Sequence, residues 1–464
     1  MTAAASVEFD SDLIRRYDNQ GPRYTSYPTA ASFTTEFDAS KYTAQALASN
    51  DLPIPPALSI YAHIPFCEQL CYYCGCNKIV TRHKEKCAPY LQTLLQEAKL
   101  QGSLFDSDRE VVQLHFGGGT PTYLSDDQLY QLMSGLSENF SFAGPEKREF
   151  SIEIDPRTVD ANRISRLTDM GFNRVSMGIQ DFDARVQIAV NREQSFDSVE
   201  QLFIAARETD IRSLSIDLIY GLPHQTVRSF HNTLELVSRL RPDRISIYNY
   251  AHLPHRFKSQ RLIRSQDLPD ATEKLALLNL CVTYLCAEGY EYIGMDHFAL
   301  PNDELCVARD DGTMHRNFQG YSTRRGLDLI GLGVSAISSV GRCFAQNQVK
   351  LQHYSETVNN GHLAIAKGLT IDDDDLMRAE IIDHLMCYSK IPVKDFESRW
   401  KIKFNVRFES ALSRLTAMTR DGLLETTDDG YQITPRGRML LRPIAMCFDA
   451  HLSQGTTPGF SKVI

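Results

Sequence analysis

A run of β-forming residues followed by an amphipathic helical stretch occurs six times between Leu58 and about residue 250. That order of elements is typical of parallel strands joined by crossover helices. Because a closed barrel of this kind has eight such units, six units indicate an α/β fold with an incomplete (β/α)6 TIM-like barrel. A doubly wound sheet would show the same order and stays an alternative. The predicted strands are residues 58–64, 111–116, 149–154, 174–179, 213–220 and 244–250.

The rest of the chain is predicted to surround this barrel, which we assign to residues 57–300. Residues 1–56 form an N-terminal arm with a basic and aromatic patch, and we expect this arm to cover the active site. Residues 301–354 contain a Gly-rich apolar run and are interpreted as a barrel extension and linker. Residues 355–464 are mostly helical, and the helix–hairpin sequence at 421–438 is one that winged-helix domains also have.

Each predicted strand is followed by Gly, Pro or polar residues. The carboxyl ends of parallel strands lie at one edge of the barrel, where barrel enzymes place their active sites. The second of these segments is Gly117-Gly118-Gly119-Thr120-Pro121. Glycines let a backbone approach a ligand closely, and a tight turn alone would explain them equally well.

Four of the 11 cysteines fall within residues 67–76, directly after the first predicted strand. The N-terminus lacks the basic-then-apolar order of a signal peptide, and no stretch reaches about 18 consecutive apolar residues. We therefore expect a cytoplasmic protein with no membrane partner. In that reducing compartment a dense cysteine run indicates metal binding or catalysis before it indicates disulfides.

The spacing Cys67-x3-Cys71-x2-Cys74 favours an iron–sulfur cluster. Such clusters bind cysteine thiolates, normally four, so three ligands would leave one iron of a [4Fe–4S] cluster open to another ligand. A zinc site usually has two separated cysteine pairs, whereas the further cysteine here, Cys76, lies only two positions after Cys74. A redox pair formed by Cys71 and Cys74 would leave Cys67 unexplained.

The cysteine run, with Tyr73 just before its last cysteine, resembles the signature of radical S-adenosylmethionine (SAM) enzymes. The resemblance implies a radical SAM barrel in which Cys67, Cys71 and Cys74 ligate a [4Fe–4S] cluster whose fourth iron is chelated by SAM. Segments along almost the whole chain resemble the oxygen-independent coproporphyrinogen III oxidase family: residues 21–30, 61–83, 115–124, 173–182, 217–226, 249–254, 294–299 and 315–321.

This family resemblance also implies a reaction. A 5′-deoxyadenosyl radical would take hydrogen from the β-carbon of a propionate, and loss of CO2 and one electron would leave a vinyl group. Two propionates of coproporphyrinogen III would react in this way and give protoporphyrinogen IX, in heme biosynthesis. The resemblance implies a monomer, and the sequence does not identify the electron donor or the final acceptor.

The resemblance further assigns residues to two SAM molecules. The cluster-bound SAM would contact Tyr61, Gly118 and Glu153, and Cys76 would lie near the site without ligating iron. Asp217 also attracts attention by itself, because a carboxylate inside an apolar strand needs a partner or a ligand. The second SAM would be surrounded by Tyr73, Gly119, Thr120, Gln180, Arg192, Asp217, Ala251 and Ile337.

Charge and resemblance together limit the partners. The formal net charge of −9 excludes a strongly basic nucleic-acid footprint, and we expect no nucleic-acid partner. A substrate with four carboxylates still needs local cations, for which Arg15, Arg16, Arg23, Arg324 and Arg325 are candidates. Two alternatives stay open: a heme chaperone that shares the radical SAM core, and an iron–sulfur regulator that binds DNA.

Overall fold

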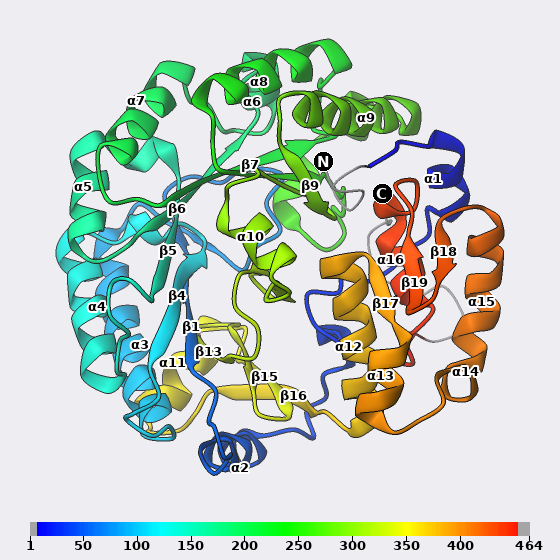
Figure 1. The fold of residues 1–464 in the computed structure, drawn as a ribbon. Coiled ribbons are helices and arrows are strands. Elements are labelled where there is room, and N and C mark those ends of the chain that lie inside the picture. The colour runs from blue at the N-terminus through cyan, green and yellow to red at the C-terminus, as the bar shows by residue number, and fades with distance from the viewer. Residues whose placement is uncertain (1–6, 453–464) are drawn as a thin grey trace.

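The computed structural model describes residues 7–452, which contain a curved 12-stranded sheet in the order β16-β15-β14-β13-β1-β4-β5-β6-β7-β8-β10-β9 (Figure 1). Six neighbouring strands in its middle are parallel, and they are the six predicted strands. The sheet stays open between β16 and β9, so the prediction of an incomplete α/β barrel is confirmed. The strands are β1 (Leu58–Ile64), β4 (Val111–Gly118), β5 (Glu149–Ile154), β6 (Arg174–Gln180), β7 (Ser213–Tyr220) and β8 (Arg244–Asn249).

A layer of helices covers the outer face of the parallel strands (Figure 1). Alternate residues of each strand are apolar and fully buried under this layer, as Leu214, Ile216 and Leu218 are on β7. Helix α4 begins with a capping box in which Ser125 and Gln128 satisfy each other's backbone N–H groups. The helices are α3 (Cys87–Gly102), α4 (Asp126–Asn139), α5 (Ala161–Asp169), α6 (Ala184–Ala189), α7 (Phe196–Arg207), α8 (Val227–Leu240) and α9 (Ala271–Ala287).

Strands that the sequence did not predict extend both edges of the sheet. The Gly-rich run at 326–341 supplies β13 (Asp328–Leu332), which pairs in parallel with β1, and β14 (Ile337–Val340). Antiparallel strands follow on this side, and a short antiparallel pair extends the β8 edge. These and the smaller elements are β2 (Phe66–Cys67), β3 (Ile79–Val80), β9 (Glu291–Gly294), β10 (His297–Ala299), α10 (Glu304–Asp310), β11 (His315–Asn317), β12 (Gly320–Ser322), β15 (Cys343–Asn347), α11 (Leu351–Asn359) and β16 (Ile365–Thr370).

The C-terminal domain lies across the open side of the sheet, at the right of Figure 1. Its elements run in the order helix, strand, helices and β-hairpin, and the hairpin of β18 and β19 lies within the segment 421–438 whose sequence was interpreted as helix and hairpin. Phe396, Phe404, Phe408 and Phe448 pack together in its core. The elements are α12 (Asp373–Tyr388), β17 (Lys390–Pro392), α13 (Val393–Trp400), α14 (Phe404–Arg407), α15 (Glu409–Arg420), β18 (Leu424–Thr427), β19 (Gly430–Ile433) and α16 (Leu441–Met446).

The N-terminal arm contacts both the C-terminal domain and the edge of the sheet. After α1 (Ser11–Tyr17), the hydroxyl of Tyr24 donates to Asp449 at 2.9 Å. Thr34 pairs with Gly368 of β16, and α2 (Ala39–Asn50) packs on the neighbouring strands. The arm therefore covers an edge strand whose N–H and C=O groups would otherwise be open to another chain.

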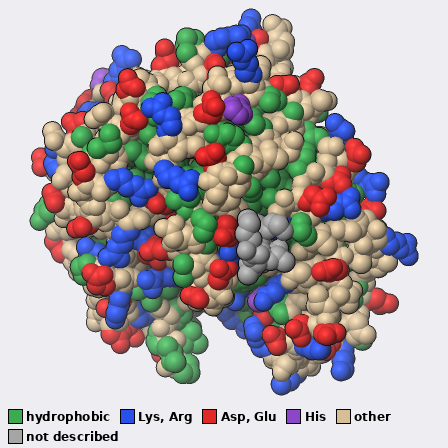
Figure 2. Space-filling view, turned by 45° about the horizontal axis from the view of Figure 1, so that its top comes forward, with side chains coloured by type: hydrophobic (Ala, Val, Ile, Leu, Met, Phe, Trp, Pro, Cys, Tyr) green, Lys and Arg blue, Asp and Glu red, His purple; other side chains and the backbone are tan. Residues whose placement is uncertain are grey.

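Acidic and basic side chains are mixed over the face of the molecule shown in Figure 2. The net charge of −9 is thus not gathered into one acidic area on that face. Among residues 7–452, none of the helices combines the length and the hydropathy that crossing a bilayer requires.

Candidate active site

The cysteines that follow β1 lie in one loop, residues 67–76, which we call the cluster loop. Its backbone turns where the N–H of Cys74 donates to the carbonyl of Cys71 at 3.2 Å. Other segments hold it: Asn191 donates to the carbonyl of Leu70 at 2.8 Å, and Gln260 donates to that of Tyr73 at 2.8 Å. All four cysteines of the loop line one cavity of about 480 Å³.

The thiols of this loop receive hydrogen bonds from neighbouring side chains. Thr120 donates to Cys67 Sγ at 3.6 Å, and Arg192 and Arg157 donate to Cys71 Sγ at 3.4 and 3.5 Å. Burial raises the pKa of the Cys67 thiol to about 11, so this thiol becomes a good metal ligand only when a bound metal displaces its proton. Donors aimed at thiolate sulfur are the surroundings in which iron–sulfur clusters are found.

The glycine run after β4 forms a second wall of the cavity. Gly118 has φ of 117°, a backbone conformation that residues with a side chain rarely adopt. A Cβ added at Gly119 would lie 2.7 Å from the carbonyl oxygen of Pro65, so only glycine lets this backbone approach the start of the cluster loop. The N–H of Gly118 donates to Glu153 Oε2 at 3.2 Å.

Glu153 stands at the end of β5 and carries a negative charge into the cavity. Burial acts against its ionisation, but the hydrogen bond from His115 at 3.1 Å and the one from Gly118 outweigh burial and lower its pKa. An ionised carboxylate can accept hydrogen bonds from an ammonium or hydroxyl group of a bound ligand, and the neighbouring glycines leave the backbone accessible to the same ligand.

Arg192 is buried against the cluster loop. Its guanidinium lies 3.2 Å from Asp155 and also donates to the carbonyl of Gly178. Burial alone would lower its pKa, yet negative neighbours that include Asp155 raise it. Asp155 also holds Arg157 at 2.7 Å, so one carboxylate orients both cations that touch Cys71.

Asp217 reaches the cavity from β7. Burial, and next the charge of Glu153, raise its pKa to about 6. It accepts a hydrogen bond from Ser176 at 3.1 Å. Close by, at the end of β6, Gln180 has φ of 69°, a left-handed conformation uncommon for non-glycine residues.

The cavity brings together most of the residues that the sequence singled out. Its lining includes Tyr73, Gly118, Gly119, Thr120, Glu153, Gln180, Arg192 and Asp217 as well as Cys67, Cys71, Cys74 and Cys76. It does not include Tyr61, Ala251 or Ile337. Tyr61 donates to His63 or accepts from it at 3.1 Å and stacks on His115, Ala251 follows β8, and Ile337 packs near Phe33 and Phe344.

The predicted substrate cations differ in their surroundings. Arg15 and Arg16 lie on α1 beside Asp12 and Asp421, at 3.6 and 2.9 Å. Arg324 pairs with Glu149 at 3.1 Å, and Arg325 pairs with Asp383. Arg23 lies 3.1 Å from Asp296 and 5.6 Å from the ring of Tyr248, a residue that lines the cavity.

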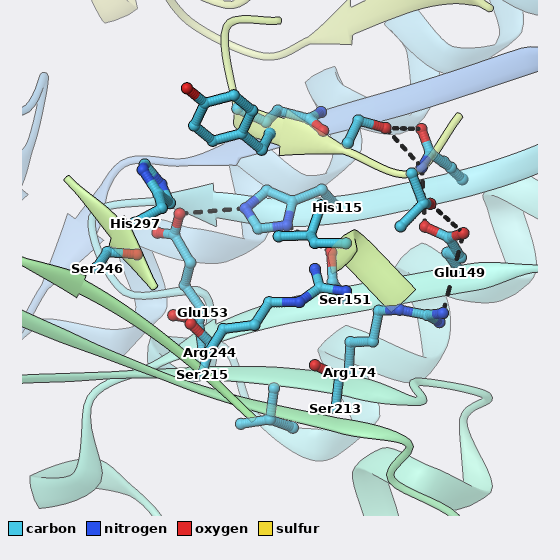
Figure 3. Close-up of a pocket in the computed structure, with 18 of the residues that line it drawn as sticks. His115, Glu149, Ser151, Glu153, Arg174, Ser213, Ser215, Arg244, Ser246 and His297 are labelled. Carbon is cyan, nitrogen blue, oxygen red and sulfur yellow. Dashed lines mark hydrogen bonds and ion pairs between the residues drawn. The ribbon is translucent and has the colours of Figure 1, made fainter. Parts of the chain in front are cut away.

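A polar chamber of about 190 Å³ continues from the cavity into the barrel interior, and sequence reasoning missed it (Figure 3). The two share Glu153, Ser176, Asp217 and Tyr248. Figure 3 shows His115 turned toward Glu153 and Arg174 extended toward Glu149. The alternation of polar and apolar residues along the strands was the available signal, because fully packed parallel strands are apolar on both faces.

Other residues of the site lay in segments that the sequence marked without assigning them. Asp155 directly follows a predicted strand, and its partner Arg157 comes two residues later. His63 and His115 stand on β1 and β4 within conspicuous motifs. Nothing in a single sequence shows that these side chains meet around one carboxylate or one thiol.

The fold and this site define a radical SAM protein. The model of the Radical SAM superfamily matches residues 61–237, and that of the HemN C-terminal domain matches residues 371–440. The oxygen-independent coproporphyrinogen III oxidase of Salmonella typhimurium is 47% identical over 459 residues, 99% of each chain. That of Pseudomonas aeruginosa is 45% identical, also over 99% of each chain.

A solved structure agrees with these relatives. Coproporphyrinogen III oxidase (HemN) from Escherichia coli, described as a radical SAM enzyme, superposes with a TM-score of 0.91 and is 46% identical. The superposition covers 96% of this chain and 100% of that one. The chain therefore belongs to the oxygen-independent coproporphyrinogen III oxidase family, whose cofactors are a [4Fe–4S] cluster and SAM. Three thiols around one cavity, beside a glycine-lined wall, fit both groups.

Proposed function

We propose that this protein catalyses the oxidative decarboxylation of two propionate side chains of coproporphyrinogen III to vinyl groups, giving protoporphyrinogen IX. One observation carries the proposal: a chain 47% identical to oxidases of that name over 99% of its length gathers Cys67, Cys71 and Cys74 around a single cavity. The relatives are named as oxidases, which favours this activity over a heme chaperone or a DNA-binding regulator.

Each propionate must lose a β-hydrogen atom, CO2 and one electron. When bound, the cluster and SAM supply the one-electron chemistry that removes the hydrogen atom. The chain must bind the cofactors close to the reacting propionate of the substrate and exclude water and oxygen from the site. An electron donor and a final electron acceptor are required in addition, and both are unidentified.

In our proposal, some residues of the cavity hold the cluster and others bind SAM. Cys67, Cys71 and Cys74 hold the cluster, and their donors Thr120, Arg157 and Arg192 stabilise negative charge on sulfur. Glu153 and the open backbone at Gly118 receive polar groups of the cluster-bound SAM. Tyr61, which stacks on His115, is a further contact of that molecule in our proposal. We assign a second SAM to Tyr73, Gly119, Thr120, Gln180, Arg192 and Asp217, which line the cavity together with Cys76, and to Ala251 and Ile337, which lie outside its lining.

The arm and the basic residues complete the proposal. Among the candidate cations, we assign Arg23 to a substrate carboxylate, because its guanidinium lies over the ring of Tyr248, which lines the cavity. The arm of residues 1–56 would thus contribute to covering the site. We also propose that the chain divides into a barrel at 57–300, an extension at 301–354 and a C-terminal domain at 355–464. The protein would act in the cytoplasm as a monomer, without nucleic-acid or membrane partners.

Anaerobic reconstitution with iron and sulfide, followed by reduction and addition of SAM and coproporphyrinogen III, tests the function. We expect a [4Fe–4S] spectrum, 5′-deoxyadenosine and a divinyl product. Cys67→Ser should lose both the normal cluster and turnover, whereas Cys286→Ser, outside the cavity, should keep both. A protein that binds heme but forms no divinyl product would contradict the proposal. Loss of turnover in Cys76→Ser with an intact cluster would place Cys76 beside the chemistry.

A further inference from the structure

The proposed reaction consumes electrons that another molecule must deliver, and this inference rests on that proposed function. One side chain connects the thiol of Cys71 with the outside of the cluster loop. Arg157 Nη2 donates to Cys71 Sγ at 3.5 Å, and Nη1 of the same guanidinium donates to Gln69 Oε1 at 3.0 Å. Both Arg157 and Gln69 also line a surface hollow of about 640 Å³.

The hollow is bordered by a basic segment, residues 78–86, which we call the basic strip. The strip contains Lys78, Arg82, Lys84 and Lys86 against the single acid Glu85, in a chain whose net charge is −9. Residues 82–86 are all exposed. The other walls of the hollow add the acids Glu68 and Glu193 and the cation Arg157, and Lys84 lies 3.6 Å from Glu68. The strip and the hollow together therefore carry five cations and three acids.

The basic strip forms hydrogen bonds with both ends of the cluster loop. The N–H of Thr81 donates to the carbonyl of Cys67 at 2.9 Å, continuing the short pairing of β2 with β3. At the other end of the loop, Lys78 Nζ donates to the carbonyl of Cys74 at 2.9 Å. A protein seated on the strip would therefore rest directly against the segment that carries the three ligand cysteines.

Val80 gives this surface an apolar centre. It lies in β3, lines the hollow, and is 41% exposed although it is a large hydrophobic residue. An apolar residue bordered by charges that are mainly positive matches the anatomy of a transient protein interface, in which the charges steer and the apolar centre is desolvated.

We propose that the basic strip and the hollow beside it form the docking surface for an acidic protein that carries single electrons. In the docked complex, one electron passes from the reduced carrier to the oxidised cluster, and no proton or atom is transferred. Positive charge on an otherwise acidic protein brings an acidic partner to this surface rather than elsewhere. Such attraction between exposed charges weakens as salt screens it.

The test uses the cluster-loaded protein and an acidic plant-type ferredoxin as the probe, without substrate. The variant is Arg82→Glu/Lys86→Glu, because within the described residues neither side chain forms a hydrogen bond or ion pair and both are exposed. Glu at position 86 also suits the N-terminus of α3. The matched control is Lys403→Glu/Arg420→Glu in the C-terminal domain. This control variant has the same net charge as the Arg82→Glu/Lys86→Glu variant.

We expect ferredoxin binding to weaken at least tenfold in the Arg82→Glu/Lys86→Glu variant and to change less than twofold in the control. Reduction of the cluster by reduced ferredoxin should slow in parallel, whereas reduction by sodium dithionite should not. Binding by the parent protein should also fall as salt rises, with a smaller slope in the variant. Equal binding by parent and variant, or equal loss in variant and control, would overturn the proposal. Because no substrate is present, failure of the proposed decarboxylation would leave these binding results unchanged.

Discussion

The carboxyl group of Asp217 is buried on β7, and burial raises its pKa from 3.8 to about 6. Between about pH 4 and 6 the folded protein therefore holds a proton that the unfolded chain has released, so stability falls as pH rises through that window. Above it the charged carboxylate costs about 3 kcal/mol, at about 1.4 kcal/mol for each unit of pKa difference. Asp217→Asn removes this cost.

We expect Asp217→Asn and the parent to have similar stability near pH 4 and the variant to be more stable by up to about 3 kcal/mol at pH 8. Anaerobic thermal melts across this pH range measure the difference. Ser176→Ala, which removes a hydrogen-bond donor to Asp217, is the control and should lower stability at pH 8. If Asp217 binds SAM as proposed, its replacement should lower turnover while it raises stability. Equal pH profiles for variant and parent would contradict the assignment of the buried charge.

Single residues of the site were predictable where the chain itself marks them. The three cysteines are close in sequence, and the glycine run and Asp217 stand out within apolar strands, so each could be chosen without a structure. Arg157 and Asp155 could not be predicted, because Arg157 donates to Cys71 across 86 positions of the chain and Asp155 acts by holding Arg157. Likewise, the hydrogen bond between His115 and Glu153 depends on the register of β4 against β5.

At the level of elements, helix α3 holds the turn between β13 and β14 through one buried carboxylate. Glu97 accepts hydrogen bonds at 2.6 Å from the N–H of Gly333, from Asn347 and from the hydroxyl of Tyr354. Glu97→Ala would leave these buried donors without that acceptor, which should cost about 3–5 kcal/mol. Tyr354→Phe, which removes one donor only, should cost about 1–2 kcal/mol.

Denaturant unfolding measures both costs, and hydrogen exchange at the Gly333 amide should rise most in Glu97→Ala. Equal destabilisation by the two substitutions would show that Glu97 does not hold the turn. Because β14 begins with Ile337, a residue proposed for the second SAM, a loosened turn should also weaken SAM binding.

The elements that the sequence predicted well are those with local patterns. Strands β1 and β4 to β8 each combine apolar residues facing helices with turn residues at their ends, and their positions follow from that pattern. Strand β13 was not predicted because it pairs with β1 across 270 residues, Leu58 with Asp328, and a glycine-rich sequence gives no sign of such a partner. The polar interior was visible in the alternation, but it was not read as a chamber.

At the scale of the whole molecule, the largest hydrophobic cluster among residues 7–452 spans the arm, the barrel and the C-terminal domain, and three smaller clusters lie beside it. The same cluster contains Leu13 and Tyr24 of the arm, Ile60 of the barrel, and Leu441 and Phe448 of the C-terminal domain. Buried hydrogen bonds cross the boundary as well. Arg438 donates to the carbonyl of Tyr292 at 2.5 Å, and Tyr24 donates to Asp449 at 2.9 Å. A chain of this length with separate cores would unfold domain by domain.

We therefore expect calorimetry of the cluster-loaded protein to show one unfolding transition that includes the C-terminal domain. Tyr24→Phe breaks a buried bond between the arm and that domain, and this should lower the free energy of unfolding by about 1–3 kcal/mol. The transition should move to lower temperature as a whole, because the arm, barrel and C-terminal domain share the core that this bond joins. Lys403→Glu, an exposed change in the same domain, is the control and should leave the midpoint in place. A separate early transition in Tyr24→Phe would mean that the C-terminal domain unfolds without the barrel and that the shared core does not couple them.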